Sequence, residues 1–378
     1  MIQTILYLSI FLSAMPDSNR IVSETDSLPI NQFQFLGSHN SYRKKTYQPL
    51  WDELHRLKHP FTKLFVVQPW NYTHASLDSQ LTIYGLRSLE LDLYHDPEGG
   101  RFYFRTGNKK IKQQTESNVE DLKKPGMKVM HVPDYDYETH HYLFTSALTE
   151  IKSWSDKNPN HEPLFIMVEL KELQFMKYIF PRNCSKVLPF TKNALDSVDQ
   201  EIESVFGKNS DQVFTPDELR GNFSTLNEAI LKNGWPTLKS VKGKIFFILM
   251  AEEETQEKYI EGHESLKGRN MFVFGEEGKP ESAFIKIGNP KKQKKEITEL
   301  VKKGYIVRTR SDVPTKDASK NKYKKSEMAF ASGAQIISTD YYAGDKCYLD
   351  KNVCSNFKIM MPGGKFFRKN PVLIQDRN

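Results

Sequence analysis

The stretch LRSLELDLY, residues 86–94, alternates apolar and polar side chains with the two-residue period of a β-strand. Its leucines fall on one face, and Glu90 and Asp92 fall on the other, about 7 Å apart along the strand. Two carboxylates at that spacing, followed by the turn-forming residues 96–100, predict an oxygen-rich site for a divalent cation at the end of the strand. The alternative is an ordinary strand that exposes its acids to water.

Similar stretches recur along the chain and predict a barrel. We expect β-strands at residues 33–37, 86–94, 128–132, 164–170, 244–250, 271–274, 305–309 and 335–339, with 282–287 as an alternative for the sixth. Helical patterns with one apolar face lie between many of them, at residues 142–154, 194–206 and 291–303. A strand followed by a helix, repeated about eight times, predicts a (β/α)8 TIM barrel of the α/β class.

The chain of 378 residues is longer than the ~250 residues usual for this fold. We therefore expect loop insertions, the largest around residues 172–242 and a second at 99–126. Residues 1–14 form an apolar run that is too short to span a bilayer and is followed by polar residues, which predicts a secretory signal peptide. Residues 15–378 are expected to form one secreted TIM-barrel domain without a transmembrane segment.

Composition narrows the class of partner. The formal charge of +7 favours an anionic partner, but the basic residues are dispersed and lack interleaved aromatics, which disfavours nucleic acid. Three Asn-x-Ser/Thr triplets are compatible with a glycoprotein, and they begin at Asn71, Asn183 and Asn222. Three cysteines are too few for a disulfide scaffold and lack zinc-site spacing. Cys347 and Cys354 are close enough in sequence to form one disulfide, which leaves Cys184 over.

Polar side chains follow the expected strands, at the end of a TIM barrel where active sites lie. Packing polar groups at the ends of several strands is costly unless they bind something together. Their carboxylate and amide oxygens select Ca²⁺ or Mg²⁺ over zinc, and the mixture of the two favours Ca²⁺. The candidate residues are His39, Asn40, Glu90, Asp92, His131, Glu169, Lys171, Arg308, Asp340 and Tyr341.

Two histidines beside a divalent cation suit the cleavage of a phosphodiester. One imidazole can take a proton from the attacking hydroxyl and the other can protonate the departing oxygen, while the metal neutralises charge on the phosphoryl group. The pattern leaves open whether water or a substrate hydroxyl attacks. It also leaves open a purely structural role for either histidine.

Four motifs in this order resemble the catalytic barrel of phosphoinositide-specific phospholipase C, especially its secreted, single-domain, calcium-dependent branch. They are Gly-Ser-His39-Asn40-Ser-Tyr, Leu-Glu90-Leu-Asp92, Met-His131-Val-Pro-Asp134-Tyr-Asp136 and Val-Glu169-Leu-Lys171. Later stretches at residues 233–238, 308–312 and 331–341 agree with this resemblance, which covers most of the chain.

The resemblance implies a role for each candidate. His39 becomes the general base and His131 the general acid. Lys171 and Arg308 are expected to bind headgroup phosphates, and Asp340 and Tyr341 to line the substrate site. The implied calcium ligands are Asn40, Glu90, Asp92 and Glu169.

The family's reaction uses the inositol 2-hydroxyl to attack phosphorus, which gives diacylglycerol and a cyclic inositol phosphate. The resemblance leaves open whether the cyclic product is released or hydrolysed further. Glycerophosphodiester phosphodiesterases and sphingomyelinase D-like enzymes are the alternative, because they use similar groups on the same barrel. Their first strand typically ends in His-Arg-Gly, whereas this chain has His39-Asn40-Ser41. A further alternative is an inactive barrel that binds anionic lipid.

Two clusters of lysines are expected near the active site, since helices that follow barrel strands begin at that end. We expect them to bind an anionic membrane surface. The alternative is a pair of solvated helix faces. The clusters are Lys291, Lys292, Lys294 and Lys295, and Lys316, Lys320, Lys322, Lys324 and Lys325.

Overall fold

The computed structural model describes residues 25–57, 70–173, 175–178, 180, 182, 184–312, 317–343, 356–364 and 366–374. The expected signal peptide, the acceptor Asn183, Lys316 and the pair Cys347 and Cys354 lie outside these residues. Within the described ranges, no helix has both the length and the apolar character needed to cross a membrane.

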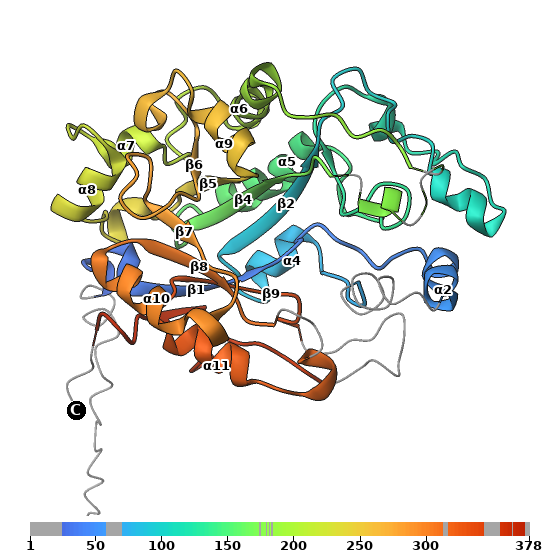
Figure 1. Ribbon diagram of the computed structural model, residues 1–378. Helices are drawn as coiled ribbons and strands as arrows, with labels where there is room; N and C mark the ends of the chain where they lie inside the picture. The colour runs from blue at the N-terminus through green and yellow to red at the C-terminus, as the bar shows by residue number, and fades with distance from the viewer. Residues whose placement is uncertain are drawn as a thin grey trace, which may run out of the picture.

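Parallel strands curl into a barrel, which confirms the predicted fold (Figure 1). A parallel bridge between Phe274 and Phe284 joins the two end strands and closes the ring. In the order of the sheet the strands are β6 (Met271–Val273), β5 (Ile245–Met250), β4 (Leu164–Leu170), β2 (Ser88–Tyr94), β1 (Phe33–Ser38), β9 (Ile336–Thr339), β8 (Ile306–Arg310) and β7 (Phe284–Lys286).

The prediction of a third barrel strand at residues 128–132 is wrong. β3 (Lys128–Val129) has only two residues, pairs antiparallel with the end of β2 and lies off the barrel path. Pro133 lacks the N–H that a strand needs to continue its ladder, and the backbone N–H of Val132 instead turns back to the carbonyl of Asp136. The third barrel strand is β4, and β7, from the stretch expected as an alternative, is the sixth.

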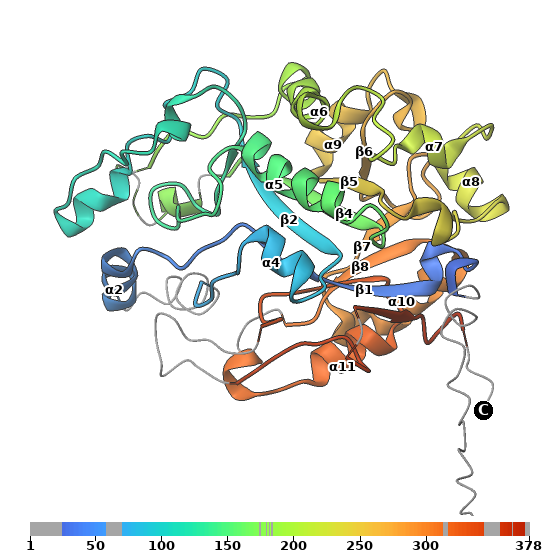
Figure 2. The same ribbon diagram turned by 180° about the vertical axis from the view of Figure 1, so that it is seen from behind.

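Helices cover the outside of the barrel (Figures 1 and 2). Those at the three predicted positions bury one apolar face each, as Ala147, Leu148 and Ile151 do in α5, so these predictions are confirmed. The segment between β4 and β5 contains η5 (Phe175–Tyr178), α6 (Lys192–Phe206), α7 (Pro216–Arg220), α8 (Leu226–Lys232) and η6 (Lys239–Val241). The outer helices are α4 (Leu77–Thr82), α5 (Phe144–Lys157), α6 (Lys192–Phe206), α7 (Pro216–Arg220), α8 (Leu226–Lys232), α9 (Glu253–Ile260), α10 (Pro290–Lys303) and α11 (Lys324–Ala331).

Short elements complete the fold. β10 (Phe367–Lys369) pairs antiparallel with β1. The 3-10 helices are η1 (Ile30–Gln32), η3 (Thr106–Ile111), η4 (Glu120–Lys123), η5 (Phe175–Tyr178), η6 (Lys239–Val241), η7 (Glu264–Leu266) and η8 (Ala318–Lys320).

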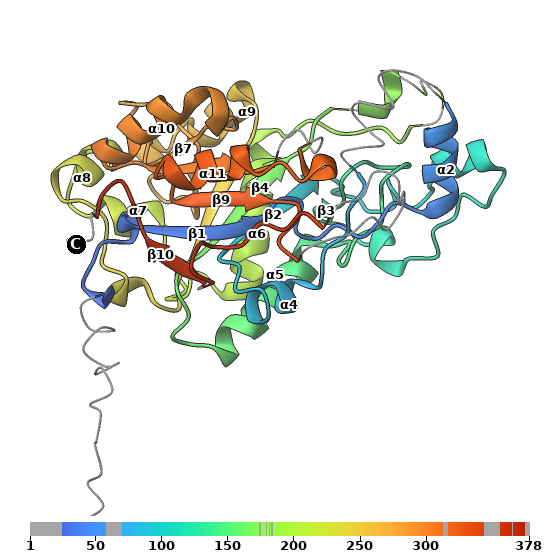
Figure 3. The same ribbon diagram turned by 90° about the horizontal axis from the view of Figure 1, so that it is seen from below.

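A lobe projects beyond the C-terminal ends of the strands (Figure 3). It includes α2 (Gln48–Arg56) in the segment that follows β1, and residues 95–143, which follow β2 and form only short elements. The lobe has its own small apolar core, in which Trp51 of α2 belongs to the same cluster as Trp70 and Tyr135. The loops after two neighbouring strands are therefore held together at the mouth of the barrel.

Phenylalanines fill one end of the barrel interior. Their ring centroids lie 5.1–6.3 Å apart from strand to strand. Phe165 and Phe284 touch although β4 and β7 are not neighbours in the sheet, so this contact crosses the interior. The rings form an apolar floor beneath the C-terminal ends of the strands, and they belong to Phe35, Phe165, Phe246, Phe272 and Phe284.

The loop after β1 is brought close to β2 by a glycine. A Cβ atom on Gly37 would lie 2.5 Å from the Cβ of Ser88 and 2.7 Å from its carbonyl oxygen, so only glycine allows this approach. Just beyond it, the N–H of Ser41 donates to the carbonyl of Glu90 at 2.9 Å. The N–H of Glu90 donates to Ser41 Oγ at 2.7 Å. These contacts fix the loop that carries His39 and Asn40 beside the acids of β2.

Candidate active site

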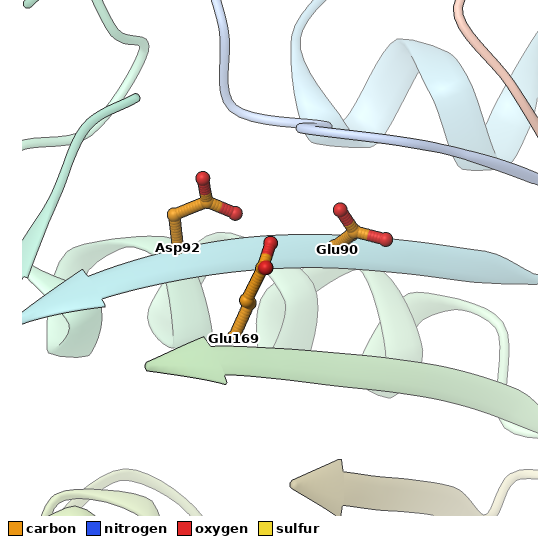
Figure 4. Close-up of side chains that lie close together, drawn as sticks. All are labelled: Glu90, Asp92 and Glu169. Atoms are coloured by element: carbon orange, nitrogen blue, oxygen red, sulfur yellow. The ribbon is translucent and has the colours of Figure 1, made fainter. Parts of the chain in front are cut away.

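Three carboxylates lie together on β2 and β4 (Figure 4). Glu90 and Asp92 project from β2 and Glu169 projects from β4, and a ligand atom of each lies within 4.8 Å of the others. Asp92 is the register partner of Glu169, so both side chains fall on the inner face of the sheet. Glu90 and Asp92 are fully buried, which rules out the alternative of a strand with solvated acids.

The donor set around these acids fits a calcium ion. Oδ1 of Asn40 and Oδ1 of Asp92 are buried and accept no hydrogen bond from the described part of the chain. Asn40 has a left-handed backbone (φ 48°), and its Nδ2 donates to the hydroxyl of Tyr72 at 3.1 Å. Buried oxygens are rarely left without a partner, and a set of carboxylate and amide oxygens is what Ca²⁺ prefers.

Two cations contact the carboxylates directly. Nη2 of Arg308 lies 2.6 Å from Oε2 of Glu90. Nζ of Lys171 lies 3.0 Å from Oδ2 of Asp92 and 2.7 Å from Oε2 of Glu169. Both residues were expected to meet headgroup phosphates, and here their positive charges neutralise the acid cluster.

His39 lies between two carboxylates. Its Nδ1 is 2.8 Å from Oδ1 of Asp340, and its Nε2 is 3.3 Å from Oε1 of Glu90. The side chain keeps 22% of its surface exposed. Burial, followed by the nearby Arg310, lowers the pKa of His39 well below its usual value, which favours the neutral imidazole.

Asp340 forms hydrogen bonds with two further residues besides His39. Nη2 of Arg310 donates to its Oδ2 at 2.9 Å, and its backbone N–H donates to Oδ2 of Asp312 at 2.7 Å. Asp340 was expected to line the substrate site. The structure places it behind the ring of His39, with a partner on each carboxylate oxygen.

His131 was expected at the end of a barrel strand, but it lies in the loop after β3. Its Nδ1 lies 2.6 Å from Oδ2 of Asp136, and its ring packs edge-on against Trp70. Burial lowers the pKa of His131, and Asp136 opposes this effect. Burial alone would raise the pKa of Asp136, but Arg43 and His131 lower it to about 2, so the carboxylate is charged.

Arg43 connects the two histidine loops. It is fully buried in the loop after β1, and its Nε and Nη2 donate to the two oxygens of Asp136 at 2.7 and 2.9 Å. The same guanidinium donates to the carbonyl of Trp70 at 2.7 Å. A basic run such as Arg43-Lys44-Lys45 usually predicts a solvated surface, so the sequence carries no signal for this buried role.

Sequence reasoning also left Arg310 and Lys286 out of the predicted site residues. The alternation Arg308-Thr-Arg310 on β8 could have placed both guanidiniums inside the barrel. Lys286 is the register partner of Arg308 and lies exposed at the end of β7. Tyr341, expected in the substrate site, is partly buried, with its ring edge-on to Phe357 and tilted against Tyr72.

Two surface predictions change with the structure. Lys325 is buried, with 4% of its surface exposed, and burial lowers its pKa to about 8, so it does not belong to a solvated lysine cluster. Asn71 is also buried, which makes it a poor glycan acceptor, whereas Asn222 is exposed.

The comparisons with known proteins agree with this geometry. The family model described as "Phosphoinositide phospholipase C, Ca2+-dependent" matches residues 28–371. A calcium-dependent phosphoinositol-specific phospholipase C from Pseudomonas sp. shares the fold, with a TM-score of 0.54 and 15% identity over 92% of this chain and 97% of that one. The Ca²⁺-dependent enzyme from Streptomyces antibioticus gives 0.50 and 14% over 83% and 95%. Direct comparison with curated protein sequences finds no match.

The barrel and its acidic mouth suit a metal-dependent phosphodiesterase, and the family match places it in the phospholipase C type. The chain belongs to the Ca²⁺-dependent phosphoinositide phospholipase C family, whose model spans nearly all of the barrel.

Proposed function

We propose that this enzyme cleaves phosphatidylinositol-type lipids into diacylglycerol and a cyclic inositol phosphate. The observation that carries the proposal is a pair of histidines, each backed by a buried aspartate, at the same barrel mouth as an all-oxygen cation site. The family match favours this activity over the glycerophosphodiester and sphingomyelinase D alternatives.

In the proposed mechanism, His39 is the general base. Asp340 accepts a hydrogen bond from Nδ1–H of the ring, so that the lone pair of Nε2 can take the proton from the inositol 2-hydroxyl. The hydroxyl oxygen then forms a bond to phosphorus. Calcium, when bound by Asn40, Glu90, Asp92 and Glu169, supplies positive charge that stabilises the phosphoryl oxygens.

His131 is the general acid of this mechanism. It donates a proton to the diacylglycerol oxygen as the bond between that oxygen and phosphorus breaks. The charged Asp136 opposes the lowering of the His131 pKa by burial, and Arg43 holds Asp136 in place. In this proposal the two similar pairs of histidine and aspartate take opposite roles, with His39 next to the acid cluster and His131 in the loop that Arg43 holds.

Phosphorus NMR of the products tests the proposal. Vesicles of phosphatidylinositol and phosphatidylcholine are incubated with the protein, once with calcium and once with excess EGTA, and the His39→Ala variant is the control. We expect the signal of a cyclic inositol phosphate only with calcium and the unmodified chain. Phosphatidic acid as product, or no turnover with calcium, would contradict the proposed reaction.

We propose that lysines at the start of α10 hold the barrel mouth against an anionic membrane surface. α10 follows β7, so its first turns lie at the end of the barrel that carries the acid cluster. The lysine side chains there are exposed, as are those of Lys320, Lys322 and Lys324 near α11. The exposed lysines in the first turns of α10 are Lys291, Lys292, Lys294 and Lys295.

We also propose that the enzyme is secreted and acts as a single domain. The ground for secretion is the apolar run at residues 1–14, together with the exposed acceptor Asn222. N-terminal sequencing of protein recovered from the medium of an expressing host tests this. An intact residue 1 on the recovered protein, or retention of all the protein in the cells, would contradict it.

A further inference from the structure

Lys171 lies in the space that the proposed calcium ligands enclose. Its Nζ is 2.7 Å from Oε2 of Glu169 and 3.0 Å from Oδ2 of Asp92. The ligand oxygens of the acid cluster lie within 4.8 Å of one another, so the ammonium group occupies much of the room between them. Lys171 leaves β4 two residues after Glu169, and its backbone N–H donates to the carbonyl of Leu93 on β2. Its backbone is therefore fixed while its side chain is long and flexible.

The acid cluster needs positive charge whenever calcium is absent. Carboxylates taken out of water are strongly unfavourable unless a cation is paired with them. Arg308 neutralises Glu90, and Lys171 neutralises Asp92 and Glu169. The two cations thus offset part of the negative charge that the three acids bring together inside the barrel.

The two cations differ in their freedom to leave. Arg308 has 5% of its side chain exposed, and its Nε also donates to Oγ of Ser338 at 3.2 Å, so it is fixed on both sides. The side chain of Lys171 is 24% exposed. An ammonium on a four-carbon stem can move toward water by rotating its own side chain, whereas a guanidinium packed in the interior cannot.

We propose that Lys171 is an exchangeable counter-ion of the calcium site, which pairs with Asp92 and Glu169 in the ion-free protein and is displaced when Ca²⁺ binds. This inference rests on the proposed function, because it takes those two acids as calcium ligands. Ca²⁺ needs its ligand oxygens at 2.3–2.6 Å, so the same lone pairs cannot also hold the ammonium. Calcium binding then moves one positive charge from the carboxylates to the mouth of the barrel, where a substrate phosphate arrives.

Calcium titration by calorimetry tests the competition. Lys171→Gln removes the competing charge, and we expect its calcium Kd to fall by about tenfold or more, the change that 1.4 kcal/mol corresponds to. The matched control is Lys286→Gln, since the charge of Lys286 acts on Glu169 from a distance but forms no ion pair with any residue that the structure describes. This variant therefore measures the loss of a nearby positive charge without the loss of a direct contact. An unchanged or weaker affinity in Lys171→Gln, or equal gains in both variants, would overturn the inference.

The displacement of Lys171 by calcium can also be measured directly in the unmodified chain. Amine labelling followed by mass spectrometry measures how accessible each lysine is. We expect labelling of Lys171 to rise several-fold on saturation with calcium while labelling of Lys302, at the far end of α10, stays constant. Calcium that binds without any change at Lys171 would overturn the counter-ion inference alone. No calcium binding by the unmodified chain would instead overturn the proposed function. If Lys171→Gln is too unstable to titrate, this labelling decides the matter.

Discussion

Nδ1 of His39 lies 2.8 Å from Oδ1 of Asp340, a residue 301 positions away in the sequence. The aspartate is 5% exposed and receives a hydrogen bond from Arg310 on its other oxygen. A buried carboxylate in this place fixes the ring's tautomer and its orientation toward the acid cluster. Asp340 is therefore a positioning residue for the proposed base.

Replacing Asp340 with Asn should lower kcat by about 10²-fold or more. The amide NH2 of Asn can donate a hydrogen bond to Nδ1, which favours the tautomer with the proton on Nε2, and that tautomer cannot act as the base. KM should change little, since Asp340 is not expected to touch the substrate. Steady-state kinetics at saturating calcium checks both constants. A higher KM with normal kcat would return Asp340 to the substrate-binding role that the sequence suggested.

The two histidines should respond differently to the leaving group. We expect His39→Ala and His131→Ala each to lower kcat by about 10²-fold or more on lipid substrate. A substrate that releases a good leaving group, such as a nitrophenolate, needs no general acid, so it should restore more rate to His131→Ala than to His39→Ala. Equal restoration in both variants would refute the assignment of base and acid.

Calcium dependence should follow the acid cluster. Glu169→Gln removes one charged ligand, and we expect weaker calcium binding and lower activity together, with activity partly recovered at high calcium. Glu252→Gln is the matched control, because Glu252 is exposed just after β5 at the same end of the barrel. Full turnover of the unmodified enzyme in excess EGTA would disprove the metal requirement.

The lysines at the start of α10 should matter only at a membrane. We expect Lys291→Gln with Lys292→Gln to reduce activity on anionic vesicles and to weaken its salt dependence, since each lysine near such a surface contributes on the order of 1 kcal/mol. Turnover of a soluble substrate should be unchanged. The control is Lys302→Gln with Lys303→Gln, the same change at the other end of the same helix. Equal losses in the two double variants would make the α10 lysines ordinary solvated residues.

The close approach of β1 to β2 should be sensitive to a single methyl group. Gly37→Ala places a Cβ 2.5 Å from that of Ser88, and we expect the free energy of unfolding to fall by about 1–3 kcal/mol as the strands move apart. Gly288→Ala is the control, because nothing lies within 4 Å of the added atom. Denaturant unfolding measures both. Equal stability of the two variants would show that the strands absorb the methyl group without strain.

The sequence by itself determined the inner and outer faces of β2. Alternation in residues 86–94 places Glu90 and Asp92 on one face because successive side chains of a strand point to opposite sides, and the structure confirms this placement. The same period failed at residues 128–132, where the apolar run was too short to separate a barrel strand from a two-residue pairing.

The partners of the site residues were decided by the tertiary structure alone. Arg308 meets Glu90 across 218 positions of sequence, and His39 meets Asp340 across 301. Local patterns report which way a side chain faces, but they do not report which strand lies opposite. That follows from the register of the strands and the closure of the barrel, which bring the inward residues of β1, β2, β8 and β9 to one mouth.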